Sequence, residues 1–476
     1  MLAARAASSA TMPLEAADPI FADLRRREFA RLDRAGHAYL DYTGSALYAE
    51  RQLRAHHDVL ADALFGNPHS ESAPSRTSSA VLAEGRARLL AHLDADPEEY
   101  VVCFTANASA AIKLVAESYR FAAGGACVLS ADNHNSVNGV REFARRSGAR
   151  VAYLPLDGAL RLADAPARLA AERRRGGAPM LFALPAQSNF SGVHHPLSLV
   201  ASAQVLGYDV LLDAAAFVSS NALSLRVTRP EFVALSFYKM FGYPTGLGAL
   251  VARRDALARL ARPWFAGGTV EYASVQNDVH ALRSSWEGFE DGTPNFLGVA
   301  ALPTGFALLA DVGLERLTAH VSRLTSVLLD ALRALTHPDG SPVVRLYGPA
   351  DGRDRGGTIA FNVLDRRQRV VPYWIVEERA RERGVSLRGG CFCNPGASEA
   401  AFGFDPDVAS RCLRSMSTDS GFTIQRFATC MQATGDDVAV GAIRASVGLA
   451  NNDADVWRAV AVVEECGEVE GLRFEV

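Results

Sequence analysis

Short apolar runs alternate with helically periodic stretches over roughly the first 300 residues of the chain. The runs occupy residues 101–104, 127–129, 151–154, 181–184, 210–212 and 233–236. Strands of a parallel sheet are apolar on both faces because helices cover both sides. The pattern therefore predicts an α/β fold with a mostly parallel sheet flanked by helices.

The pattern changes after residue 300. Helical periodicity then runs through 300–310, 314–335 and 372–383, with few strands, one of them at 358–364. Long helices with a few strands predict a smaller α+β domain. We divide the chain into an N-terminal arm (1–35), a large domain (36–300) and a small C-terminal domain (301–476).

Composition excludes some classes of partner. Hydrophobic residues make up 49% of the 476 residues and charged residues 21%, with a formal net charge of −4. This balance gives no basic field for nucleic acid, and no apolar run reaches the 18 or so residues of a membrane span. We expect neither nucleic acid nor a membrane as partner, and we expect the Ala- and Ser-rich start, MLAARAASSATMP, to be a disordered tail rather than a targeting peptide.

The seven cysteines are an odd number in a long chain. This count does not indicate a secreted disulfide framework, so we expect reduced thiols and a cytoplasmic location. Cys391 and Cys393 stand apart because they lie in a Gly/Pro-rich stretch, RGGCFCNPG. A zinc site needs a second pair of ligands that is not found nearby, so zinc is a minor alternative there.

Lysine is nearly absent from the chain. Of its 49 lysines and arginines only two are lysines, Lys113 and Lys239, and Lys239 lies between aromatics in SFYKMFG. A lysine amine can act as a nucleophile, which an arginine guanidinium cannot do. Lys239 also follows a predicted strand, and the carboxyl ends of such strands form the ligand crevice of an open α/β sheet.

Other polar residues at strand ends suggest what Lys239 would bind. The stretch CFTANASAAIK predicts a helix N-terminus, with Ser109, that suits a phosphate. Asp213 ends the run YDVLLD and could pair with a pyridinium, His134 could stack on a ring, and Asn189 could reach a ring hydroxyl. Together these predict pyridoxal 5′-phosphate on Lys239. Each signal alone has a plainer explanation: a helix cap, a loop histidine or a surface lysine.

Several motifs carry a family resemblance. They include YLDYTGSALY (39–48), FTANASAAIKLVAE (104–117), DNHNSVNGVRE (132–142), SFYKMFGYPTGLGAL (236–250), FEDGTPNF (289–296), RGGCFCNPGA (388–397) and IRASVGLANNDADV (443–456). On these motifs the chain resembles the class V, fold type I pyridoxal-phosphate enzymes, and most of all the N-terminal desulfurase domain of molybdenum cofactor sulfurases. Those sulfurases carry a further C-terminal domain, for which we find no counterpart before Val476.

The resemblance implies roles for particular residues. Lys239 would form an imine with the cofactor, and Asp213 would pair with its ring nitrogen. His134 would stack on the ring, although a shift of one residue would give that place to Asn133. The other expected cofactor contacts are Ala108, Ser109 and Ser236 at the phosphate, Asn189 at the ring hydroxyl, and Thr293 at the phosphate of a neighbouring subunit, which implies a homodimer.

The resemblance also implies a reaction. Arg444, or alternatively Arg388, would bind the substrate carboxylate, although Arg388 could instead form a structural salt bridge. Cys393 would take sulfur from cysteine as a persulfide and pass it to an acceptor, with Cys391 as a rival nucleophile. Ser398 replaces a third loop cysteine of the sulfurases, which suggests a changed sulfur acceptor.

Three hypotheses follow for the function. The first is a cysteine desulfurase-like enzyme that acts on cysteine or a derivative of it. The second is a C–S lyase, or another elimination or replacement enzyme, that needs no protein persulfide. The third is a scaffold protein, which Lys239 and Asp213 argue against because scaffolding needs neither an imine-forming amine nor its counter-charge.

Overall fold

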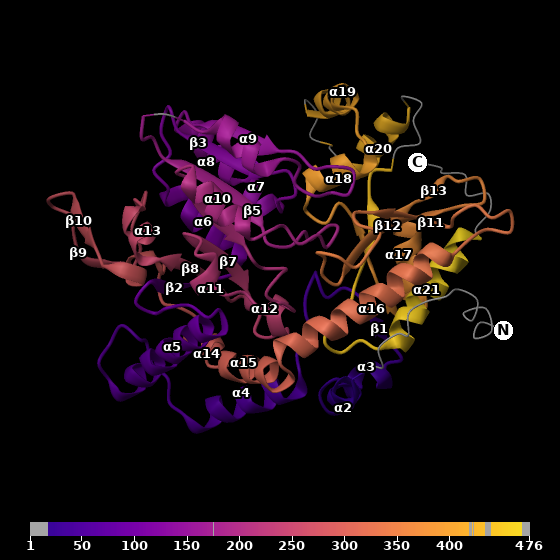
Figure 1. The fold of residues 1–476 in the computed structure, drawn as a ribbon. Coiled ribbons are helices and arrows are strands. Elements are labelled where there is room, and N and C mark those ends of the chain that lie inside the picture. Colours follow the sequence, from indigo (N-terminus) through magenta and orange to yellow (C-terminus); the bar gives the residue numbers. More distant parts are fainter. Residues whose placement is uncertain (1–17, 175, 418–420, 422, 434–438, 469–476) are drawn as a thin grey trace.

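A seven-stranded sheet forms the centre of the larger lobe (Figure 1). The computed structural model describes residues 18–174, 176–417, 421, 423–433 and 439–468. The strand order is β2-β8-β7-β6-β5-β3-β4. The strands are β2 (Tyr100–Thr105), β3 (Ala126–Ser130), β4 (Arg150–Leu154), β5 (Met180–Pro185), β6 (Asp209–Asp213), β7 (Phe232–Ser236) and β8 (Gly248–Arg253).

All strands of this sheet except β8 run in the same direction, since β8 is antiparallel to both β2 and β7. The prediction of a mostly parallel sheet is confirmed. β8 contains the end of TGLGALV. A Cβ on Gly248 would lie 2.6 Å from the backbone of Asn107 and 2.7 Å from the Leu235 carbonyl oxygen. Gly248 therefore allows close backbone packing beside the cavity described below.

Alternate residues of each strand pack on opposite faces of the sheet, as the two-residue period of a strand requires. One face packs against α5, α10 and α15, and the other against α6, α8 and α13. The helices of this lobe are α4 (Glu50–Asp62), α5 (Ala73–His92), α6 (Ala108–Ser118), α7 (Asn135–Asn138), α8 (Val140–Arg146), α9 (Ala165–Glu172), α10 (Ser198–Val205), α11 (Leu225–Thr228), α12 (Phe237–Phe241), α13 (Arg254–Arg259), η1 (Ser285–Phe289), α14 (Phe296–Val299) and α15 (Leu302–Val312).

The smaller lobe is built on an antiparallel sheet of order β11-β12-β16-β15, with β13 paired to β12. Its strands are β11 (Val344–Tyr347), β12 (Thr358–Leu364), β13 (Val370–Val371), β14 (Val385–Ser386), β15 (Arg388–Gly390) and β16 (Ala442–Ser446). Its helices are α16 (Leu314–Ala334), α17 (Tyr373–Glu382), α18 (Pro395–Phe402), α19 (Pro406–Ser417), α20 (Ile424–Gln432) and α21 (Asp453–Gly467). The long helix α16 lies along this lobe and leads into it from α15 (Figure 1).

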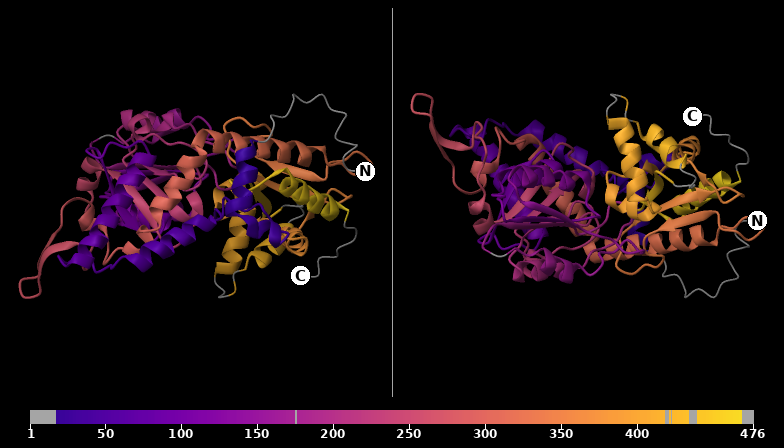
Figure 2. Two further views of the ribbon diagram at one scale, coloured as in Figure 1. Left: turned by 90° about the horizontal axis from the view of Figure 1, so that it is seen from below. Right: turned by 90° about the horizontal axis from the view of Figure 1, so that it is seen from above.

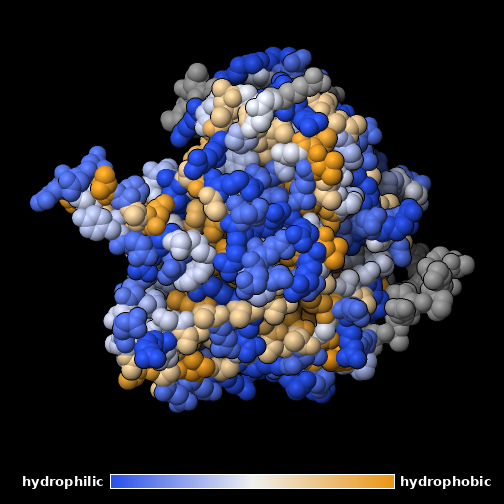
Figure 3. Space-filling view, turned by 60° about the vertical axis from the view of Figure 1, so that its left-hand side comes forward, coloured by the Kyte–Doolittle hydropathy of each residue, from blue (hydrophilic) through white to orange (hydrophobic). Residues whose placement is uncertain are grey.

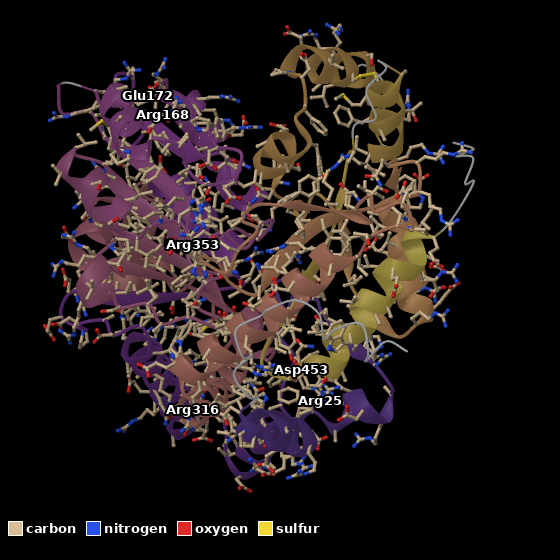
Figure 4. All side chains as sticks on the ribbon, turned by 45° about the vertical axis from the view of Figure 1, so that its right-hand side comes forward. Arg25, Arg168, Glu172, Arg316, Arg353 and Asp453 are labelled. Atoms are coloured by element: carbon tan, nitrogen blue, oxygen red, sulfur yellow. A yellow bond between two sulfur atoms is a disulfide. The ribbon has the colours of Figure 1, made fainter. Side chains whose placement is uncertain are left out.

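The start of the chain also packs on the smaller lobe. Strand β1 (Ala38–Tyr39) pairs with β14, and helices α2 (Pro19–Glu28) and α3 (Ala30–Arg34) lie near α21 (Figure 1). The buried guanidinium of Arg25 donates to Asp455 at 2.6 Å and to the Ala450 carbonyl at 2.6 Å. Figure 4 shows Arg25 beside the start of α21, which Asp453 marks. The two ends of the described chain thus meet on one lobe.

A disulfide joins Cys412 on α19 to Cys430 on α20, with their Cα atoms 5.8 Å apart (Figure 4). The expectation that all thiols are reduced is therefore wrong for this pair. The two helices form a hairpin with its own small apolar core, which brings the cysteines within bonding range. The other five cysteines are free, and the cytoplasmic location stays a prediction.

A β-hairpin of β9 (Val270–Ser274) and β10 (Val279–Leu282) projects from the larger lobe, on the side away from the smaller one (Figure 2). Its exposed apolar side chains are Tyr272, Val275 and Val279. Figure 3 shows this projection with apolar patches among polar surface. Over the described residues no single helix is long and apolar enough to cross a membrane. The segments Phe296–Val312 and Leu314–Ala334 reach that length and apolar content only when taken together, and the chain bends by 72° between them.

Candidate active site

A cavity of about 150 Å³ opens at the carboxyl ends of the parallel strands. It brings together seven of the residues predicted from the sequence, which arrive from separate strands and loops. Those seven are Ala108, Ser109, His134, Asn189, Asp213, Ser236 and Lys239. Asn107, Ile112, Ser136, Pro185, Gln187, Ala215, Ala216 and Tyr238 complete the lining. The expectation that polar residues gather at the ends of these strands is confirmed.

Lys239 lies on α12, the short helix that begins directly after β7. Among the described residues, its ammonium nitrogen has no hydrogen-bond or ion-pair partner within bonding distance. Burial lowers the pKa of Lys239, and the nearby charge of Asp213 opposes that shift. A buried amine with a lowered pKa is neutral over a wider pH range, and the neutral form is the one that attacks a carbonyl group.

Asp213 ends β6 at the floor of the cavity. One of its carboxylate oxygens accepts the backbone N–H of Ala215 at 3.0 Å. Within the described part of the chain no arginine, lysine or histidine forms an ion pair with this carboxylate. A half-buried carboxylate without a cationic partner suits a positively charged ligand group.

The N-terminus of α6 faces the same cavity. Asn107 caps the helix, and the Ser236 hydroxyl accepts the N–H of Ala108 at 2.8 Å. The exposed Ser109 hydroxyl lies 2.5 Å from the Ser136 hydroxyl. A helix N-terminus flanked by three hydroxyls suits an anion such as phosphate, because its N–H groups and dipole point toward the ligand.

His134, rather than Asn133, faces the cavity. The Nδ1 atom of His134 accepts the N–H of Ser136 at 3.1 Å, and burial lowers the pKa of the ring. Asn133 is fully buried and donates to the carbonyl of Ala183 at 3.0 Å. Asn133 therefore does not line the cavity, which favours His134 for the predicted stacking position.

Arg388 and Arg444 share one carboxylate, that of Asp41. Arg444 is buried and donates to Asp41 at 2.9 Å and to the carbonyl of Asn189 at 2.8 Å. Arg388 is about half exposed and donates to Asp41 at 2.6–3.0 Å. Burial lowers the pKa of Arg444, and Asp41 opposes that shift. The two arginines and one carboxylate leave a net positive charge beside the cavity.

The cysteine loop lies at the rim of the cavity, outside its lining. Cys393 is exposed, and its backbone carbonyl accepts the N–H of Asn135 at 2.7 Å. Lys239, Arg388 and Arg444 lie close enough to Cys393 to interact with it electrostatically.

Cys391 is directed elsewhere. Its thiol is partly buried and donates to the carbonyl of Val440 at 3.3 Å. Burial raises the pKa of this thiol. Cys393 is therefore the better placed of the two cysteines to react with a ligand in the cavity.

Thr293 does not join this cavity. It lines a separate cavity of about 350 Å³ with Lys113 and Glu117, and the amide of Asn67 lies 3.4 Å from its hydroxyl. A role for Thr293 at a neighbouring subunit's phosphate stays a prediction. No group of three or more His, Cys, Asp or Glu side chains able to hold a metal occurs in the described segments.

Sequence reasoning missed several polar residues of the site. Gln187 and Ser136 line the cavity, Asp41 holds the two arginines, and Asn394 packs behind the cysteine loop. Asp41 lies within the quoted motif YLDYTG and Asn394 directly follows Cys393. Both positions lie in or beside motifs that the sequence analysis quoted. Their partners are hundreds of residues distant in the sequence, so only the fold identifies those partners.

These groups fit pyridoxal 5′-phosphate. The free Lys239 amine, the Asp213 carboxylate without a cationic partner and the N-terminus of α6 match its aldehyde, pyridinium and phosphate groups. His134 adds a flat ring to the lining of the same cavity.

Comparison with known proteins gives the family. The model of the class V aminotransferase family matches residues 38–458. The chain is similar to the molybdenum cofactor sulfurase of Bos taurus, at 38% identity over 82% of this chain and 46% of that protein. It is also similar to molybdenum cofactor sulfurase 2 of Culex quinquefasciatus, at 37% identity over 92% of this chain and 57% of that protein. The chain thus spans about half the length of these curated relatives.

Solved structures share the fold. A cysteine desulfurase from Thermococcus onnurineus NA1 superposes with a TM-score of 0.76 at 23% identity, over 96% of this chain and 99% of that one. The cysteine desulfurase CsdA from Escherichia coli superposes with a TM-score of 0.72 at 22% identity, over 94% and 98%. The predicted fold and the family resemblance are both confirmed.

Proposed function

The chain belongs to the class V aminotransferase family, and from this premise we propose that it is a pyridoxal-phosphate-dependent cysteine desulfurase-like enzyme. It moves the sulfur of cysteine, or of a cysteine-derived substrate, to Cys393 and on to an acceptor. The observation that carries the proposal is an exposed thiol at the rim of a cavity that holds a free, partly buried lysine. Simple elimination would need the lysine but not the thiol.

Six residues would hold the cofactor. Lys239 would bind its aldehyde carbon, Asp213 its ring nitrogen and His134 its ring face, and Asn189 would contact its ring hydroxyl. The N-terminus of α6, with Ser109 and Ser236, would hold the phosphate. When bound, pyridoxal phosphate supplies an electron sink that weakens bonds to the substrate carbons.

The residues of the chain supply the remaining chemistry. Lys239 Nζ removes and returns protons, which its lowered pKa favours. Cys393 Sγ forms a bond to the substrate sulfur as the C–S bond breaks. The net reaction converts cysteine and the Cys393 thiol into alanine and a Cys393 persulfide, which balances without an added oxidant or reductant.

The substrate carboxylate has two candidate partners. Arg444 donates from separate nitrogens to Asp41 and to the carbonyl of Asn189, whereas Arg388 is about half exposed. We propose that the substrate carboxylate contacts the half-exposed Arg388, and that the buried Arg444 adds positive charge behind it. A fixed guanidinium fork suits a carboxylate.

We also propose that the enzyme is a homodimer. Thr293 lines a cavity separate from the one that holds Lys239. This position is compatible with a contact between Thr293 and the cofactor phosphate of a second copy of the chain. The exposed apolar side chains on the β9–β10 hairpin, among them the fully exposed Val275, offer surface for the same contact. The acceptor of the sulfur is a separate protein or small molecule, and we place the reaction in the cytoplasm.

The test is a product assay with L-cysteine and the cofactor-loaded protein. We expect alanine in an amount that matches the sulfur released to a thiol acceptor, and we expect Cys393→Ser to abolish both. Cys391→Ser serves as the matched control and should keep most of the activity, because that thiol is directed away from the cavity. Pyruvate and ammonia in place of alanine would contradict the proposal and indicate elimination.

A further inference from the structure

A buried polar network behind the cysteine loop begins at Asp132, which follows strand β3. One carboxylate oxygen of Asp132 lies 2.8 Å from Nε2 of His195, and both side chains are fully buried. The other oxygen accepts from the Ser188 hydroxyl at 2.7 Å and from the Asn394 amide at 2.7 Å. The reaction proposed above uses neither Asp132 nor His195. A buried carboxylate with three hydrogen-bonding partners fixes those partners in space.

Asn394 connects this carboxylate to the cysteine loop. Its backbone N–H closes a turn by donating to the carbonyl of Cys391 at 2.9 Å. Its side-chain amide lies 2.7 Å from the Asp132 carboxylate and 3.1 Å from the side-chain oxygen of Asn189. Its own side-chain oxygen caps α18 by accepting the N–H of Ala397 at 3.2 Å. Asn394 is fully buried and directly follows Cys393, so the network ends at the reactive cysteine.

Asn189 holds the other side of the same cysteine. Its amide nitrogen donates to the carbonyl of Phe392 at 2.6 Å, and it also lines the cavity that holds Lys239. The ring of Phe392 in turn lies 4.9 Å from the guanidinium carbon of Arg444. Both neighbours of Cys393 are therefore tied to one residue of the cavity.

The backbone of the loop needs such restraints. Phe392 and Cys393 have φ angles of +54° and +56°, in the left-handed region that side chains other than glycine rarely adopt. A conformation of this kind persists only where the surrounding structure over-determines it. The hydrogen bonds of Asp132, Asn394 and Asn189 are the restraints that do so.

We propose that Asp132, supported by His195, is a positioning residue that holds Cys393 in its strained conformation at the rim of the cavity. The inference rests on the proposed function, because the conformation matters only if Cys393 takes the sulfur. Asp132→Asn removes the negative charge and one of the two acceptor oxygens with almost no change in volume, so the hydrogen bonds from Asn394 and Ser188 lose the strength that a charged acceptor gives them. The loop should then relax although the fold persists.

The experiment measures hydrogen exchange by mass spectrometry in peptides that cover residues 131–136 and 388–398. It uses cofactor-loaded wild type, Asp132→Asn and Asn394→Ser, without substrate. Asn394→Ser keeps a side-chain oxygen to cap α18 but removes the amide, so it provides a second variant if Asp132→Asn fails to fold. Glu290→Gln is the matched control. Glu290 is a buried carboxylate that accepts the N–H of Phe104 at 2.7 Å, outside the cysteine-loop network.

In Asp132→Asn and Asn394→Ser we expect exchange in both peptides to accelerate at least tenfold, with the sheet peptides unchanged. The turnover number for alanine formation should fall at least tenfold, while KM and cofactor occupancy stay within twofold. Glu290→Gln should leave the loop peptides at the wild-type rate. Unchanged exchange in the loop would overturn the inference, as would faster exchange with normal turnover. A wild type that makes no alanine refutes the proposed function alone, because the exchange data still decide whether Asp132 holds the loop.

Discussion

Asp41→Asn is the change that most directly tests how the two arginines are held beside the cavity. The Asp41 carboxylate accepts from both arginines, but their surroundings differ. Only 3% of the Arg444 side chain is exposed, against 47% for Arg388. Removal of the charge therefore leaves one buried and one partly solvated guanidinium without a counter-ion.

The cost of the change comes mainly from Arg444. Removal of one partner from a buried ion pair typically costs about 3–5 kcal/mol, because the other charge stays buried and uncompensated. Arg444 keeps its bond to the carbonyl of Asn189, so we expect a loss of about 3 kcal/mol in the free energy of unfolding. Arg388 should contribute less than about 1 kcal/mol, since water can solvate it as it does an exposed pair.

The assay is a pair of double-mutant cycles followed by urea unfolding of the cofactor-free protein. One cycle combines Asp41→Asn with Arg444→Gln, and the other combines it with Arg388→Gln. The first should give a coupling energy of about 2–3 kcal/mol that changes little with salt. The second should give less than about 1 kcal/mol and weaken as salt is added, since added salt screens exposed charges more strongly than buried ones.

Two results would show that Asp41 does not act in this way. Equal coupling in the two cycles would show that burial does not distinguish the arginines. A loss below about 1 kcal/mol for Asp41→Asn would show that Asp41 does not hold Arg444 in solution. Arg383→Gln is the control for a surface arginine, because its pair with Glu465 is exposed.

Four further predictions concern the cofactor and the assembly. Lys239→Ala should abolish covalent retention of the cofactor, so that borohydride reduction adds the cofactor mass to wild type only; a reducible adduct that persists in the variant would contradict the lysine assignment. Because burial lowers the pKa of Lys239 below its ordinary 10.5, the rate of cofactor uptake by the cofactor-free protein should reach its plateau below that pH; a titration centred near 10.5 would contradict it. Between the lowered pKa of folded Lys239 and 10.5, the unfolded chain binds the lysine proton and the folded chain does not. The free energy of unfolding of the cofactor-free protein should therefore rise with pH toward 10.5, and Lys239→Met should lack this rise. Sedimentation should show a dimer, and Thr293→Ala should weaken cofactor retention; a monomer that keeps the cofactor would argue against a shared site.

Much of the fold could be predicted from the sequence because its strands are short apolar runs. Lys239, Asp213, His134 and Asn189 could be grouped because each follows such a run, and the carboxyl ends of parallel strands share one edge of the sheet. Local pattern and topology together were enough to assemble the cavity.

Two of the missed residues, Asp41 and Asn394, depend on long-range contacts. Asp41 meets Arg388 and Arg444 because β1 pairs with β14 and Asp41 itself bridges to Ser446 on β16, and neither pairing has a local signal. Asp132 and Asn394 are 262 residues apart in the sequence. The disulfide was missed because counting seven cysteines says nothing about two that face each other on neighbouring helices.

Cys393 is the residue that we expect to receive the substrate sulfur. The most direct test is to react the cofactor-loaded protein once with L-cysteine, trap thiols and persulfides with an alkylating reagent, and map the added sulfur by peptide mass. We expect one extra sulfur atom on the peptide that holds the loop, assigned to Cys393 and still formed in Cys391→Ser. Alanine formation with the extra sulfur on Cys391, or on no cysteine of the chain, would contradict this expectation.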